Sequence, residues 1–109
     1  MTKERALFLL YRYKVRIPVY NLPRIMPRCQ KQEVMVFHSV CAQTLVSQLI
    51  KDISADSLAD PIEVVRKTYY LYDDILSTSE QPVTWEFAST MESIASDILE
   101  YLRMEEKTL

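Results

Sequence analysis

Glycine is absent from all 109 residues of the chain. It is the usual source of positive φ in tight turns, and the favoured two-residue turns of β-hairpins depend on it. Phosphate-binding loops also need glycines at fixed spacing, so loops of that kind are excluded. The sequence therefore disfavours hairpin-rich folds and favours helices that are joined by Pro, Asn, Asp and Ser connections.

Histidine and cysteine are scarce, which limits the chemistry open to the chain. His38 and Cys41 share one face of a predicted helix, so both can reach one metal ion, with Cys29 as a third ligand. A closed site would still need Glu33, and no Cys-x-x-Cys pair is present. We favour the alternative in which His38 lies at the core edge and Cys41 inside it.

No other constellation indicates an enzyme. A Cys41–His38 nucleophile pair would need a partly exposed, electropositive thiol, whereas Cys41 lies between Val40 and Ala42. Asp73 and Asp74 are adjacent, but adjacent helical residues do not face each other, which favours a solvated helix face. We therefore expect a non-enzymatic protein with no catalytic residue, metal or cofactor.

Long apolar runs are also missing. No stretch approaches the roughly 18 consecutive apolar residues of a membrane-spanning helix, and the run 6–10 is too short for a signal-peptide core. Two cysteines without an export signal fit a reducing compartment. These features predict a soluble, cytoplasmic protein that has no membrane segment.

The residues that are present predict one folded domain. The chain is 49% hydrophobic and 26% charged, as globular proteins are, and 109 residues suit a single core. Its charge is strongly polarised: residues 1–31 hold eight Lys/Arg against one acid, and residues 32–109 hold five against fourteen. We expect a single domain, 1–109, with a basic N-terminal helix and Pro-rich connector (1–31) and an acidic helical body (32–109).

The N-terminal segment carries two competing patterns. Thr2 can cap a helix over residues 2–14, with apolar side chains on one face. Residues 11–17 also alternate apolar and basic side chains, as a half-buried strand would. The connector that follows holds Pro18, Pro23 and Pro27, which disfavour a helix there.

After the connector, the spacing of apolar residues predicts three longer helices. They are predicted over residues 30–53, from Asp60-Pro61-Ile62-Glu63 to about 77, and over 84–104. Their expected core stripes include Phe37, Cys41 and Leu45, then Val65, Tyr69 and Tyr72, then Phe87, Met91 and Ile94. The fold class is therefore mainly α, a compact bundle of three long helices plus a shorter N-terminal helix. A short extended segment near residues 11–19 stays open as an alternative.

The helix over 30–53 has more apolar residues than one stripe can hold, which favours burial of a second face against a partner. We expect a protein-interaction or regulatory adaptor module that self-associates, most simply as a dimer. The candidate interface residues are Met35, Val36, Val46, Ile50 and Tyr70.

The alternative function is a small nucleic-acid-associated regulator. Its candidate contacts are the basic residues of the N-terminal region, three of which share one helical stripe: Arg5, Arg12, Arg16, Arg24 and Arg28. The competing interpretation is that this basic segment simply packs on the acidic body.

Overall fold

The computed structural model describes residues 1–18, 30–55 and 58–107, and these residues form four helices. They are α1 (Lys3–Arg16), α2 (Gln30–Ala55), α3 (Pro61–Thr78) and α4 (Pro82–Lys107). No β-strand occurs in this described part of the chain. The prediction of an all-α bundle with a shorter N-terminal helix is confirmed, whereas most of the Pro-rich connector lies outside the described residues.

The first helix begins where the capping pattern placed it. The Thr2 hydroxyl accepts a hydrogen bond from the Arg5 backbone N–H at 3.2 Å. Glu4 in the first turn and Arg16 in the last complement the helix dipole. The strand alternative over residues 11–17 is wrong, because helical spacing lets Tyr13 and Ile17 pack beside the core. The helix ends before Ile17, whose extended backbone is what a residue preceding proline prefers.

The third helix also begins as predicted, and the fourth begins earlier than predicted. The Asp60 carboxylate accepts from the Ile62 N–H at 3.2 Å, and Pro61 occupies the first helical position, where its missing N–H costs nothing. The fourth helix was expected at Thr84 but begins at Pro82 by the same preference, and it continues to Lys107.

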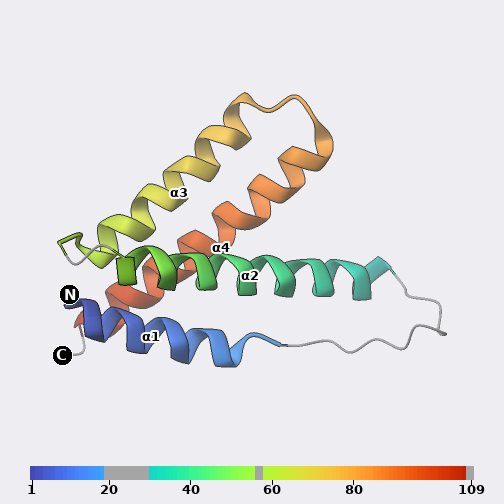
Figure 1. Cartoon of the computed structure of the whole chain (residues 1–109). Helices are drawn as coiled ribbons and strands as arrows, with labels where there is room; N and C mark the ends of the chain where they lie inside the picture. Colours follow the sequence, from blue (N-terminus) through green and yellow to red (C-terminus); the bar gives the residue numbers. More distant parts are fainter. Residues whose placement is uncertain (19–29, 56–57, 108–109) are drawn as a thin grey trace.

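The helices are arranged as a hairpin crossed by a third helix (Figure 1). The helices α3 and α4 form an antiparallel hairpin, α2 crosses it, and α1 lies along α2 in the opposite direction. The N-terminus lies beside the C-terminal end of α4, where the Met1 amino group is 3.6 Å from a Glu106 carboxylate oxygen. Lys3 adds a 3.0 Å hydrogen bond to the Ser54 carbonyl at the end of α2.

The hydrophobic core lies where the four helices meet. The small residues Ala88 and Ala95 are completely buried on α4. Around them pack the larger core side chains, which come from all four helices: Leu9, Leu10, Leu45, Leu49, Ile53, Val65, Met91, Ile94, Ile98 and Leu102.

One described stretch is long and apolar enough, by length and composition alone, to cross a membrane. It is Glu33–Ala55, within α2, which the sequence did not predict because polar residues interrupt its apolar ones. A core helix of a soluble protein meets the same criterion, and α2 supplies Leu45, Val46 and Leu49 to the core. This finding is therefore weak evidence for a membrane span.

Replacing Leu49 by alanine tests the central position of α2. The side chain is fully buried, so Leu49→Ala is expected to lower the free energy of unfolding by about 2–5 kcal/mol. Leu71→Ala removes the same atoms from an exposed site on α3 and is expected to change it by less than about 0.5 kcal/mol. Urea unfolding followed by circular dichroism measures both, and equal effects would contradict this core.

Candidate interaction surfaces

The long helices extend past the region where they pack together. At about 1.5 Å per residue, the 26 residues of α2 span about 39 Å, whereas the 14 residues of α1 span about 21 Å. The second helix and the α3–α4 hairpin also diverge toward the N-terminal end of α2 (Figure 1). The N-terminal part of α2 therefore has no helix covering it among the described residues.

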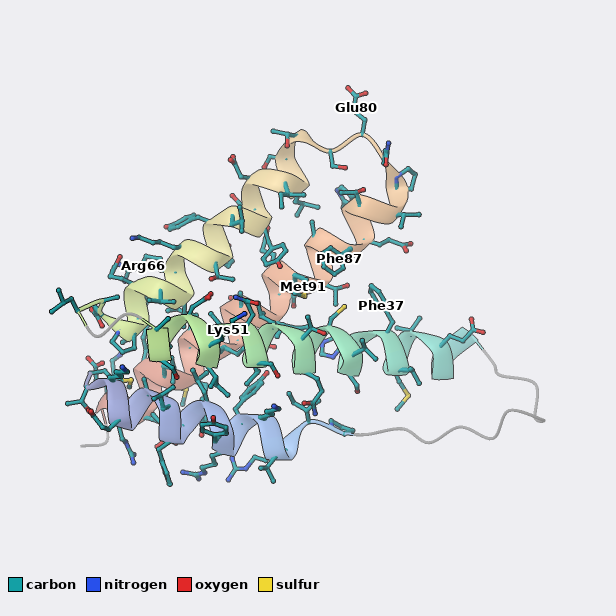
Figure 2. The ribbon with its side chains drawn as sticks, in the orientation of Figure 1. Phe37, Lys51, Arg66, Glu80, Phe87 and Met91 are labelled. Atoms are coloured by element: carbon teal, nitrogen blue, oxygen red, sulfur yellow. The ribbon has the colours of Figure 1, made fainter. Side chains whose placement is uncertain are left out.

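Two phenylalanines predicted as core lie at this divergence. Phe37 on α2 is 42% exposed and Phe87 on α4 is 40% exposed, so their assignment to the core is corrected. Figure 2 shows Phe37 on the side of α2 that faces the hairpin, and Met91, one turn beyond Phe87, is buried. The Phe87 ring contacts Tyr72 edge-on, with centroids 6.0 Å apart. The apolar stripes of α2 and α4 thus continue beyond the parts of these helices that pack in the core.

Other apolar side chains are exposed at the same end of the molecule. We call this end of the molecule the open end and define it by six of its exposed apolar residues, which lie on more than one helix face: Val34, Phe37 and Val40 of α2 and Val83, Trp85 and Phe87 of α4. Aromatic side chains are enriched in protein interfaces relative to the rest of the surface. No sequence signal identified these residues, because helical spacing shows a shared face but not where a neighbouring helix stops.

The predicted interface residues are divided between surface and core. Met35 and Tyr70 are exposed, and Val36 is partly exposed. Val46 and Ile50 are only 0% and 8% exposed, so they are corrected to core positions. The surplus apolar surface of α2 is buried on two sides within one chain, because α1 and the hairpin both pack against it.

The α3–α4 hairpin is acidic as well as apolar over most of its length. Residues 68–102 contain seven acids and no Lys, Arg or His. Two of the acids, Glu80 and Glu86, line a shallow pocket of about 320 Å³ together with Trp85 at the connection between α3 and α4. Figure 2 shows Glu80 projecting from this connection. The tip of the hairpin therefore presents an aromatic ring in the same pocket as two carboxylates.

The crowding of acids also shifts pKa values within the hairpin. Burial raises the pKa of Glu92, and a hydrogen bond to Asp73 with the repulsion between the two carboxylates raises it further. Glu92 is in turn the main cause of the raised pKa of Tyr69. One Glu92 carboxylate oxygen is buried and has no hydrogen-bond partner among the described residues. Carboxylates on α3 and α4 thus repel one another across the hairpin.

The predicted arginine stripe does not form one surface. Arg5 lies 3.6 Å from a Glu105 carboxylate oxygen, and its guanidinium carbon is 5.5 Å from the centre of the Phe8 ring. Arg12 and Arg16 are exposed on α1. Arg24 and Arg28 lie outside the described residues. The N-terminal part of α1 therefore packs on the acidic end of α4, as the packing interpretation expected, while its C-terminal part remains exposed.

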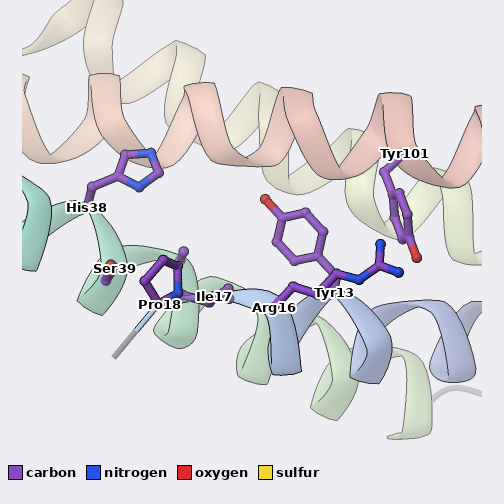
Figure 3. Close-up of a pocket in the computed structure, with 8 residues that line it drawn as sticks. Tyr13, Arg16, Ile17, Pro18, His38, Ser39 and Tyr101 are labelled. Carbon is purple, nitrogen blue, oxygen red and sulfur yellow. The ribbon is translucent and has the colours of Figure 1, made fainter. Parts of the chain in front are cut away.

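A pocket of about 310 Å³ lies between the end of α1, α2 and α4 (Figure 3). Its polar lining comprises Tyr13, Arg16, His38, Ser39 and Tyr101. The Tyr13 and Tyr101 rings are 5.6 Å apart, and the Tyr101 hydroxyl is buried with no partner among the described residues. Burial, followed by the charge of a nearby aspartate, raises the pKa of Tyr13. The lining offers hydrogen-bonding groups, but no carboxylate among its residues orients His38 as a base.

The histidine and the cysteine that were considered as metal ligands lie in different surroundings. His38 is exposed and lines the pocket beside α1, whereas Cys41 is buried, close to Tyr72 of α3. Burial raises the pKa of the Cys41 thiol, which makes it a poor nucleophile. In the described part of the chain no three His, Cys, Asp or Glu residues are grouped as metal ligands, and Cys29 lies outside it.

Comparison with protein-family models, curated proteins and solved structures finds no match to the chain.

Substituting Glu92 by glutamine tests the repulsion between the two hairpin carboxylates. The folded-state pKa of Glu92 is raised, so its ionised form opposes folding as pH rises above about 4, the value for an unfolded glutamate. At pH 7, Glu92→Gln is expected to raise the free energy of unfolding by no more than about 1 kcal/mol, since solvent screens the pair. Thermal melts from pH 3 to 8 measure this gain, which is expected to vanish below about pH 4.

The control is Glu100→Gln, which removes the charge of an exposed glutamate on the same helix. A gain for Glu92→Gln that is equal at pH 3 and pH 7 would argue against the repulsion.

Proposed function

We propose that this chain is a non-enzymatic protein-interaction module that self-associates through its open end. The observation that carries the proposal is the exposure of Trp85, Phe87 and Phe37 at the end of the molecule where α2 and the hairpin diverge. Trp85 is 50% exposed although it is the only tryptophan in the chain. Burying such rings against a second protein removes apolar area from water at about 25 cal/mol per Å².

The nucleic-acid alternative receives less support from the described residues. Only Arg12 and Arg16 of its five candidate arginines are exposed there, and Arg5 already pairs with Glu105. A phosphate backbone needs several cations on one surface, and the acids of the hairpin would repel it. A cytoplasmic location is part of the proposal, since a reducing compartment suits the free, buried thiol of Cys41.

Removing Trp85 tests the open end directly. Light scattering after size exclusion is expected to show a wild-type mass that rises above the monomer's across the micromolar range. Trp85→Ser is expected to weaken this association at least several-fold, because it removes the largest ring of the surface.

The matched control is Met104→Ser, which removes an exposed apolar side chain from the opposite end of α4 and is expected to leave the association unchanged. A wild-type protein that stays monomeric at every concentration would overturn the proposal.

A further inference from the structure

The helix α1 presents a second apolar surface, and this one is basic. Phe8, Tyr11 and Val15 are exposed and lie one helical turn apart, on the side opposite the buried Leu9 and Leu10. Arg12 lies beside them, and Arg16, which is exposed but also lines the pocket between α1, α2 and α4, lies at the edge of this face. We call this surface the outward face of α1, and it comprises Phe8, Tyr11, Arg12, Val15 and Arg16.

The charges of the outward face have no acidic partner within the described part of the chain. The ion pairs of α1 there involve Met1 and Arg5, both near its N-terminus. Arg12 and Arg16 form none. An exposed helix face that combines aromatic side chains with unpaired arginines suits a surface that is both apolar and acidic.

The hairpin tip is such a surface, and it belongs to the same chain. Val83 and Trp85 are exposed there, and Glu80 and Glu86 line the pocket beside the indole ring. The nearest basic residues along the sequence are Lys67 and Arg103, so the chain supplies no cation to the tip from residues 68–102. Arginine side chains can both stack on the indole ring and pair with the carboxylates.

We propose that the outward face of α1 in one copy of the chain packs on the hairpin tip of a second copy. The proposal rests on the self-association proposed above and identifies the two surfaces that meet. The apolar residues of both surfaces supply the favourable area, and the opposite charges set the orientation and exclude pairing of like surfaces.

The positions of the two surfaces determine the kind of assembly. In Figure 1, α1 forms one edge of the molecule and the connection between α3 and α4 forms the opposite end. Because the two surfaces lie at opposite sides, a single contact between two copies leaves one surface of each kind unoccupied, where further copies can bind. The mass is therefore expected to pass beyond the dimer as concentration rises and to fall with added salt, which screens exposed charges.

A charge-reversal pair tests which surfaces meet. The first variant, Arg12→Glu with Arg16→Glu, makes the outward face acidic, and the second, Glu80→Lys with Glu86→Lys, makes the tip basic. Each alone is expected to lose at least ten-fold in association strength by light scattering, because its two surfaces then carry like charge. An equimolar mixture is expected to restore association, because every contact between unlike variants again joins opposite charges.

Two controls accompany the pair. Lys51→Glu with Lys67→Glu makes the same change of charge at exposed lysines outside α1 and is expected to associate as the wild type does. Circular dichroism melts establish that each variant is folded, and Trp85 fluorescence reports burial of the tip in the mixture.

The outcomes separate the two proposals. Reversal variants that associate as the wild type does, or that fail to recover when mixed, would overturn the pairing of these surfaces and leave self-association standing. A monomeric wild type would overturn both.

Discussion

The burial of α2 between α1 and the α3–α4 hairpin is the interaction on which the rest of the structure depends. The wide apolar surface of α2 cannot be covered from one side, and its residues 45, 46, 49 and 50 are all buried in one core together with residues of α1 and of the hairpin. A side chain buried in this way contributes about 1.5–3 kcal/mol relative to its exposed state. The same two-sided burial fixes where α1 lies, and hence which of its residues face solvent.

Length determines where this packing ends. The first helix spans little more than half of α2, and the hairpin diverges from it, so the N-terminal part of α2 and the outer part of α4 project beyond the shared core. Phe37 and Phe87 have the helical spacing of core residues, yet each ring is about two-fifths exposed because the described part of the chain covers it only in part. The exposed rings are therefore a consequence of helix length and crossing direction rather than of a local pattern.

This difference explains what could be predicted from the sequence. Helices and their starts depend on neighbours within four residues, and so Thr2, Asp60 and Pro61 identify them correctly. Whether a predicted interface residue is exposed or buried depends on which helices pack together and over what length. That packing involves side chains that are distant in sequence. The pattern of α2 alone makes Val46 available to a partner, whereas the packing of α1 and the hairpin around this helix leaves it buried. The open end, the hairpin tip and the outward face of α1 all require the tertiary arrangement.

The polarised charge has two different roles along one helix. Near the N-terminus of α1, the terminal amino group and Arg5 lie beside Glu106 and Glu105, so part of the excess positive charge is neutralised within the chain. Farther along the helix, Arg12 and Arg16 have no such partner in the described residues. In the hairpin, burial and the neighbouring carboxyl of Asp73 raise the pKa of Glu92. Ion pairs within the chain thus involve the N-terminal part of α1 and the C-terminal end of α4, and leave the C-terminal part of α1 and the hairpin tip without such pairs among the described residues. The unpaired ends cannot meet within one copy, because they lie at opposite sides of the molecule, and a second copy is the simplest source of the missing charge.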